Sequence, residues 1–467
     1  MRTFHDRSGR LAVRQAPWKL LAAVATLGLG GPVGYEGPSI YAGAAVGTSL
    51  QRRLRRFFTA ADAKVLLVAG AAAGVAAIFK APVTGLVFAL EVPYQEDLAR
   101  KMLLPAAISA AASYVTFAAI AGTEPLLPVA GQPPFDLRDL GGAAAVGLIA
   151  GLLARAFVAL VQAAKALSSR GNPVVRATIG GLVMAAVVLA GHLITEEPLV
   201  IGPGYDALRW ALDPQRSVVA IIALGTLRVV GTTAVLGGGG VGGLFIPLVI
   251  QGALVGRALG GVFDTANTTL FPVVGMAAFL GAGYRVPLAA VVFVAEVTGR
   301  PGFVVPGLIA AVVAQLVVGR ASVSAYQIAG RVGHLEGRLR LPLSSVVDTE
   351  TRTVPPDATV EELFWQHLVA GRQHSTAVVD GDTYLGIVGT DQANTIDRSA
   401  WPTTRVAAIM RTDVAAAEPA WPLRDAIEAM DAAATDRLAV CDAGGFVGVI
   451  TATDLVQLDE ILGDDEP

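Results

Sequence analysis

The sequence has few of the features on which soluble enzymes and disulfide-rich proteins depend. It contains one cysteine, Cys441, which excludes a disulfide framework and any site with several cysteine ligands. Charged residues are 16% of the 467 residues, against about 25% in soluble globular proteins. None of the five histidines is followed by glutamate, so the His-Glu-x-x-His motif of a membrane zinc protease is absent. We therefore expect no enzyme activity, no metal site and, at a net charge of −3, no nucleic-acid partner.

Apolar residues make up 54% of the chain, its mean hydropathy is +0.59, and its 53 glycines favour close helix packing in a membrane. The longest apolar runs cover Met102–Gly122, Gly141–Leu167, Ala177–Ile194, Val218–Leu236 and Val304–Val318. Shorter runs cover Pro38–Leu50, Val65–Phe79, Pro82–Val92, Gly243–Leu259, Val273–Gly283 and Pro287–Val297. Because a membrane helix needs about 20 residues, the shorter runs predict broken or re-entrant helices that are buried in protein.

The composition changes near Arg338–Pro342, which predicts a membrane domain over residues 1–338 and a soluble domain over 339–467. The soluble part is itself doubled, over about 343–396 and 403–463. Each half has an amphipathic helix followed by two short strands. We predict the helices over Thr359–Val369 and Pro422–Ala433. This pattern is typical of a small α/β domain made of two packed halves.

The membrane part contains an internal repeat. Residues 70–92 match residues 275–297, and the paired Pro82/Pro287, Phe88/Phe293 and Glu91/Glu296 carry most of the similarity. A Gly-x-x-x-Pro turn precedes each copy, at Gly34–Pro38 and at Gly243–Pro247. Duplicated halves with interrupted helices indicate a transporter fold whose binding site lies between the repeats.

The first turn places a single carboxylate, Glu36, among glycines at the start of a helix. The free amides and the positive end of a helix favour an anion. Two such helix starts directed at one point would hold a small anion without a full positive charge. Glu36 would compete with that anion when ionised and release the site when protonated. Alternatively, Glu36 is a solvated loop residue or an ordinary acid at a helix N-terminus. Acidic residues within membrane segments are, however, functional candidates by default.

Four segments together resemble the CLC family of chloride channels and chloride/proton antiporters: GGPVGYEGPSI (Gly30–Ile40), KAPVTGLVFALEV (Lys80–Val92), GGLFIP (Gly242–Pro247) and VPLAAVVFVAEVTG (Val286–Gly299). The resemblance implies a mainly α, polytopic membrane domain with an inverted repeat and broken helices. It also implies that Glu36 is the gate and that the protein is a homodimer with one pore per subunit. The anion-binding residues that it implies are Gly34, Gly37, Gly243, Phe245, Ile246 and Ser324, or Tyr326 in place of Ser324.

Three departures from the family pattern matter. The upstream Gly-Ser-Gly-Ile-Pro segment, which supplies a serine ligand in the family, is absent; we expect that the N-terminal part of the membrane domain is missing, through a misplaced start codon or a truncated gene. The inner proton-relay glutamate of the antiporters is replaced by Val92. The pore tyrosine of the family aligns with Ser324 without gaps, and with Tyr326 after a shift of two residues.

The soluble part resembles a tandem pair of CBS domains, regulatory modules that bind adenine nucleotides in some proteins. The Gly-x-x-Thr/Ser-x-x-Asp pattern of the nucleotide site is present at Gly448, Thr451 and Asp454, whereas Gly389 and Gln392 replace two of its residues in the first half. We expect no required cofactor, and at most one nucleotide site, at Thr451 and Asp454. The alternative is that Asp454 only caps the following helix.

These observations predict a multi-pass protein of the plasma (inner) membrane with the CBS pair in the cytoplasm. Its expected function is transport of chloride or a similar small anion, gated by Glu36, in a channel-like or weakly proton-coupled manner. A chloride/proton antiporter and a nonconducting, truncated remnant remain open as alternatives.

Overall fold

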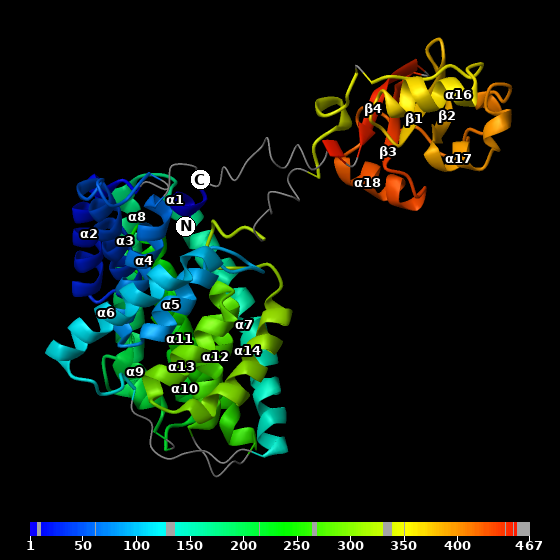
Figure 1. Ribbon diagram of the computed structural model, residues 1–467. Coiled ribbons are helices and arrows are strands. Elements are labelled where there is room, and N and C mark those ends of the chain that lie inside the picture. Colours follow the sequence, from blue (N-terminus) through cyan, green and yellow to red (C-terminus); the bar gives the residue numbers. More distant parts are fainter. Residues whose placement is uncertain are drawn as a thin grey trace. The chain divides into compact units, whose positions relative to one another are not determined.

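The computed structural model describes residues 1–6, 11–60, 62–127, 136–213, 215–263, 269–329, 339–349, 351–443, 445–451 and 453–454 (Figure 1). The chain divides into two units, residues 1–331 and 332–466. The predicted domain boundary between residues 338 and 339 lies next to 330–338, which are outside the described residues, so its position stays a prediction.

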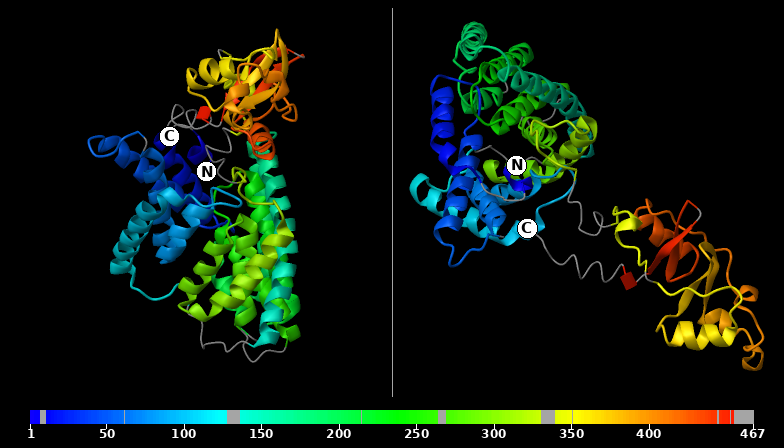
Figure 2. Two further views of the ribbon diagram at one scale, coloured as in Figure 1. Left: turned by 45° about the vertical axis from the view of Figure 1, so that its right-hand side comes forward. Right: turned by 90° about the horizontal axis from the view of Figure 1, so that it is seen from above.

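The first unit is a bundle of helices with varied tilts, and α6 projects from its side (Figures 1 and 2). The α-helices are α1 (Arg2–His5), α2 (Ala16–Gly28), α3 (Glu36–Arg53), α4 (Ala63–Phe79), α5 (Pro82–Glu91), α6 (Leu103–Ala121), α7 (Leu137–Ser168), α8 (Pro173–Thr195), α9 (Tyr205–Ala211), α10 (Val218–Gly238), α11 (Phe245–Phe263), α12 (Leu270–Tyr284), α13 (Pro287–Thr298) and α14 (Val304–Val318). Short 3-10 turns are η1 (Val13–Gln15), η2 (Arg100–Met102) and η3 (Pro301–Phe303).

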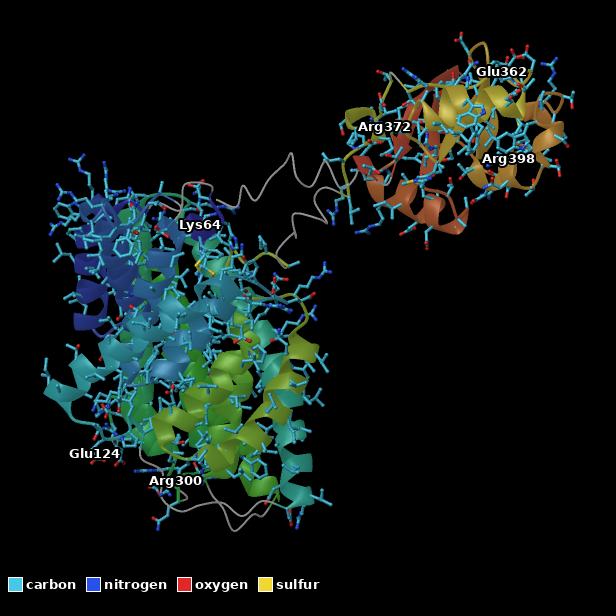
Figure 3. All side chains as sticks on the ribbon, in the orientation of Figure 1. Lys64, Glu124, Arg300, Glu362, Arg372 and Arg398 are labelled. Carbon is cyan, nitrogen blue, oxygen red and sulfur yellow. The ribbon has the colours of Figure 1, made fainter. Side chains whose placement is uncertain are left out.

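Five of the described helical segments are long and apolar enough to cross a membrane, and they coincide with the five long apolar runs of the sequence. They cover Arg100–Ala121, Leu137–Ser168, Pro173–Thr195, Val218–Gly238 and Pro301–Val318. Charged side chains lie at the ends of the bundle: Lys64 at one end, and Glu124 and Arg300 at the other (Figure 3). This distribution fits an apolar band between two aqueous surfaces.

The shorter apolar helices α4, α5, α12 and α13 each bury more than half of their residues, as their length predicts. In α12, every residue from Leu270 to Gly283 is buried. A Cβ atom on Gly275 would overlap the carbonyl of Gly252, and one on Gly70 would overlap the carbonyl of Gly43. These two close approaches occupy equivalent positions of the repeat, so the duplication is visible in the packing of α3 on α4 and of α11 on α12.

The two copies of the repeat cap each other. Glu296 of α13 accepts hydrogen bonds from the amides of Val83 (2.9 Å) and Thr84 (2.7 Å) and from the Thr84 hydroxyl (2.6 Å), at the start of α5. Glu91 of α5 accepts from the amides of Leu288 (3.1 Å) and Ala289 (2.8 Å), at the start of α13. These amides have no partner within their own helices. Glu91 and Glu296 are therefore structural partners of helix ends.

The basic residues that the repeat pairs, Lys80 and Arg285, both end a helix in the left-handed conformation, with φ of 51° and 58°. The Lys80 ammonium donates to the Ala121 carbonyl at the end of α6 (2.9 Å). Arg285 lies 3.9 Å from the Glu96 carboxylate. Lys80 therefore binds a helix end, and Arg285 lies beside an acid.

The second unit contains two antiparallel hairpins, each preceded by a helix. Its elements are η4 (Leu343–Ser345), α16 (Val360–Glu362), the π-helical η5 (Leu363–Val369), β1 (Ser375–Asp380), β2 (Thr383–Gly389), α17 (Thr390–Asn394), η6 (Arg398–Ala400), η7 (Val406–Ala408), α18 (Leu423–Ala432), β3 (Arg437–Asp442) and β4 (Gly445–Thr451). Strand β1 pairs with β2, and β3 with β4, each with one register shift. The predicted doubled α/β pattern is confirmed, except that the first predicted helix is mostly a π-helix.

Candidate functional site

The two Gly-x-x-x-Pro turns lie against each other through their backbones. The Gly34 amide donates to the Gly243 carbonyl (2.9 Å), and the Gly243 amide donates to the Gly34 carbonyl (2.8 Å). This antiparallel bridge joins segments more than 200 residues apart and brings together the first turns of α3 and α11. The site between the two repeats is therefore fixed mainly by main-chain atoms.

Glu36 is the first residue of α3, and only 1% of its surface is exposed. Its Oε1 atom accepts a hydrogen bond from the amide of Phe245, the first residue of α11. The Ile246 amide also faces this carboxylate. Among the described residues, the buried Oε2 atom has no hydrogen-bond partner. The Glu36 carboxylate thus occupies the amide-rich end of α11, where a negative charge is stabilised.

The glycines around Glu36 leave the space that its side chain fills. A Cβ atom on Gly34 or on Gly243 would overlap the Glu36 carboxylate. A Cβ atom on Gly37 would lie 3.1 Å from the Gly243 nitrogen, which is a tight contact. The structure therefore brings together Gly34, Gly37, Gly243, Phe245 and Ile246, five of the residues that the sequence nominates for anion binding.

Aromatic rings surround the start of α11 on the side of the protein interior. The Phe245 ring lies 4.7 Å from the rings of Phe79 and Phe293, 5.5 Å from Phe88 and 6.4 Å from Tyr284, measured between centroids. These rings line the protein interior beside the Phe245 residue whose amide binds the buried Glu36 carboxylate. An ion that replaces this carboxylate would depend on backbone amides and on hydroxyl groups for its solvation.

The two candidates for a pore hydroxyl lie after α14. Ser324 Oγ lies 3.7 Å from the Met1 sulfur, and 52% of the Tyr326 surface is exposed. Neither residue has a described contact with Glu36 or with the amides of α11. Their role as anion ligands stays a prediction.

Sequence reasoning did not nominate two other tyrosines that interact with Glu36. Tyr205, the first residue of α9, interacts electrostatically with Glu36, and its ring stacks on Tyr35 with a centroid separation of 6.4 Å. Tyr284, the last residue of α12, also interacts with Glu36. Of these two tyrosines, only Tyr284 lies within the aligned repeat. Its alignment with Phe79 is the sequence feature that could have identified it.

Val92 directly follows α5, at the position that the resemblance assigns to the inner glutamate of the antiporters. Its carbonyl accepts a hydrogen bond from the Gln327 side-chain amide (3.0 Å). The neighbouring acid, Glu91, is engaged by the amides of α13. At this position the chain therefore has an aliphatic side chain next to a carboxylate that holds a helix end.

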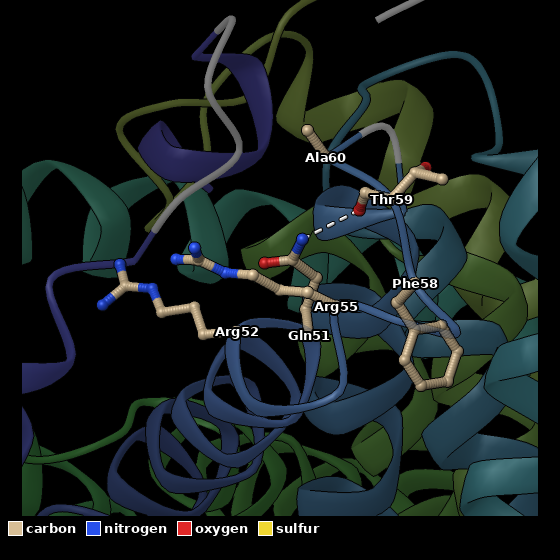
Figure 4. Close-up of a pocket in the computed structure, with 6 residues that line it drawn as sticks. All are labelled: Gln51, Arg52, Arg55, Phe58, Thr59 and Ala60. Carbon is tan, nitrogen blue, oxygen red and sulfur yellow. Dashed lines mark hydrogen bonds between the residues drawn. The ribbon is translucent and has the colours of Figure 1, made fainter.

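The basic segment that follows α3 lines a separate cavity of about 530 Å³ (Figure 4). Arg52 and Arg55 line it, and the Gln51 side-chain amide donates to the Thr59 carbonyl across it (2.8 Å). Since α3 runs for 18 residues from Glu36 to Arg53, this cavity lies about 25 Å from the Glu36 carboxylate. It is distinct from the site at the helix starts.

In the second unit, the two candidate nucleotide residues bind each other. Asp454 Oδ2 accepts hydrogen bonds from the Thr451 amide (2.7 Å) and from the Thr451 hydroxyl (2.8 Å). The Gln392 side chain accepts in the same way from the Gly389 amide (2.9 Å) in the first half. This geometry agrees with the capping interpretation of Asp454 and leaves nucleotide binding a prediction.

Residues 1–319 match the family model described as voltage gated chloride channel, and residues 406–460 match the model of the CBS domain. The chain belongs to the voltage gated chloride channel, or CLC, family. The predicted fold class, a mainly helical CLC membrane domain with a small C-terminal CBS region, is confirmed. Within the CBS region the family model covers the second half, and the first half shows the same order of helix and hairpin.

Individual CLC proteins show the same relationship. The H(+)/Cl(-) exchange transporters ClcA of Vibrio campbellii and Vibrio parahaemolyticus are 28% and 29% identical over 323 residues, which are 66% of this chain and 68% of each relative. The crystal structure of a CLC-type fluoride/proton antiporter matches with a TM-score of 0.60 and 25% identity, over 68% of this chain and 78% of that chain. A eukaryotic CLC transporter shares the fold, with a TM-score of 0.54 and 18% identity over 94% of this chain and 80% of that chain.

Proposed function

We propose that the protein transports chloride or a similar small anion across a membrane, and that Glu36 is its gate. The observation that carries this proposal is the buried Glu36 carboxylate on the free amides at the start of α11. A carboxylate and a small anion need the same ligands there, so each excludes the other. Amide dipoles bind an anion less tightly than a full positive charge, which permits the rapid release that transport requires.

Protonation controls this competition. A neutral Glu36 side chain loses its charge-assisted hydrogen bond to the Phe245 amide, and such bonds are about twice as strong as neutral ones. An anion then displaces the side chain from α11. Anion flux is therefore expected to rise as the solution becomes more acidic.

We further propose that the coupling to protons is absent or weak. Val92 cannot carry a proton, and the adjacent Glu91 is held by the amides of Leu288 and Ala289. The second candidate function is proton-coupled anion exchange. The names of the relatives favour it, since those from Vibrio are H(+)/Cl(-) exchange transporters and the solved relative is a fluoride/proton antiporter.

Proteoliposomes that contain the full chain, with chloride efflux and external pH recorded together, separate these functions. Chloride efflux without proton movement supports the channel-like function, whereas proton uptake in a fixed ratio to chloride supports exchange. Glu36→Ala is the control, because it removes the gate but leaves the α11 amides in place. If the chain alone gives no chloride flux, and a chain with an added upstream segment does, the chain is an incomplete pore.

We also propose that the protein forms a homodimer in the plasma (inner) membrane, with one pore per subunit and with its CBS pair in the cytoplasm. Mass measurement in detergent tests the dimer, and a monomer at all concentrations would refute it. Protease accessibility of the CBS region in oriented vesicles tests the orientation.

An adenine nucleotide at Thr451 and Asp454 is a further proposal for the CBS pair. It requires that the phosphate and the ribose replace the hydrogen bonds between these two residues. Calorimetric titration with ATP, AMP and adenosine tests it. Asp454→Asn should weaken binding, and Asp391→Asn, a change in the first half, is the matched control.

A further inference from the structure

The two repeats differ at one aromatic position beside the anion site. Phe79 ends α4 and Tyr284 ends α12, and the repeat aligns these two residues. Each is followed by a basic residue in the left-handed conformation, Lys80 or Arg285. Both rings pack near Phe245, with centroids at 4.7 Å for Phe79 and 6.4 Å for Tyr284. The hydroxyl of Tyr284 is therefore the one chemical difference between two equivalent rings.

The surrounding residues hold this ring in position. Its edge meets the Phe88 ring at 5.6 Å, with an interplanar angle of 82°. Its carbonyl accepts a hydrogen bond from the Gln327 side-chain amide (2.8 Å), which also reaches the Val92 carbonyl. These contacts hold the ring beside Phe245 at the start of α11, and the Tyr284 hydroxyl interacts electrostatically with Glu36.

This hydroxyl has the chemistry of an anion ligand. A phenolic O–H group can donate one hydrogen bond to an anion or a carboxylate. The Glu36 carboxylate on the Phe245 amide is a buried acceptor whose Oε2 atom lacks a hydrogen-bond partner among the described residues. An anion that enters when Glu36 leaves would meet this proton together with the amides of Phe245 and Ile246.

We propose that the Tyr284 hydroxyl is a direct ligand of the transported anion and determines how tightly the site holds it. This inference rests on the proposed anion transport through the Glu36 site. It assigns the hydroxyl ligand to the end of α12 rather than to Ser324 or Tyr326, which have no described contact with that site.

The test compares chloride binding to the full chain and to Tyr284→Phe, by calorimetric titration in detergent and by the chloride dependence of efflux from proteoliposomes. Tyr284→Phe keeps the ring and recreates the aromatic pair of the other repeat, so the fold is expected to survive; gel filtration and the melting temperature verify this. Tyr114→Phe is the matched control, because it removes the hydroxyl of a tyrosine on α6 that has no described contact with Glu36. Ser324→Ala and Tyr326→Phe test the two alternative hydroxyls. Loss of one hydrogen bond to a charged ligand predicts about tenfold weaker chloride binding in Tyr284→Phe, with chloride binding to Tyr114→Phe unchanged.

Chloride binding within twofold of wild type in folded Tyr284→Phe would overturn this inference, and so would a larger loss in Ser324→Ala or Tyr326→Phe. Neither result would affect the proposed transport function, because the wild-type chain would still bind chloride and Glu36→Ala would still change its efflux. Failure of the wild-type chain to bind or conduct chloride, with or without the upstream segment, would overturn the transport function and this inference together.

Discussion

The glutamates that cap the opposite repeat allow a quantitative prediction. Glu296→Ala removes the acceptor of three donors at the start of α5, the amides of Val83 and Thr84 and the Thr84 hydroxyl. Glu91→Ala removes the acceptor of two amides at the start of α13. A donor left unpaired in a water-poor interior costs at least about 1 kcal/mol. Glu296→Ala should therefore lower the free energy of unfolding by about 3 kcal/mol, and Glu91→Ala by about 2 kcal/mol.

Equilibrium unfolding in mixed detergent and SDS micelles measures both losses, and Glu124→Ala, at an exposed acid, is the control. Glu296→Gln keeps one acceptor oxygen and should lose less than Glu296→Ala. Losses below about 0.5 kcal/mol in both alanine variants, the range of surface substitutions, would refute the capping argument. A stable Glu91→Ala protein that no longer moves protons would instead show that Glu91 carries protons.

Three further predictions concern the gate, the glycines around it and the cysteine. Glu36→Gln should raise chloride efflux at neutral pH and abolish its increase on acidification; efflux measured between pH 4 and pH 8 that still rises in this variant would contradict the gating role. Gly243→Ala should displace the Glu36 carboxylate, and we expect either the same loss of pH dependence or an unstable protein. The control is Gly181→Ala, at an open position on α8, which should change neither chloride efflux nor the melting temperature. Burial raises the pKa of the Cys441 thiol, so this thiol should react with DTNB at pH 7 more slowly than free cysteine, with a rate that increases toward pH 9; a rate above that of free cysteine at pH 7 would contradict this.

The sequence predicts the helices well because hydropathy and helix breakers determine them locally. The run Pro82–Val92 becomes α5 (Pro82–Glu91), and Val304–Val318 is identical to α14. The start of α3 differs from the apolar run Pro38–Leu50, because the helix begins two residues earlier, at Glu36. Residues 36–38 can all lie in the first turn, where N–H groups need no intrahelical acceptor and where a proline, which has no N–H group, is tolerated.

The site is only partly predictable from the sequence. The repeat and the glycine turns identify Glu36 and the start of α11, since those residues lie within conspicuous motifs. The backbone bridge between Gly34 and Gly243 and the approach of Tyr205 depend on packing between distant segments. A position-by-position comparison of the two repeats would have shown Tyr284 opposite Phe79, although not its approach to Glu36.

A binding site made of peptide groups has a consequence for how this protein can diversify. The Phe245 and Ile246 amides that face Glu36 belong to every non-proline residue, so substitutions of these side chains leave the donors unchanged. Gly34 and Gly243 are more constrained, because a Cβ atom at either position would displace the Glu36 carboxylate. Substitutions of the Phe245 and Ile246 side chains can therefore change the size and polarity of the site without removing the amide groups that bind the anion.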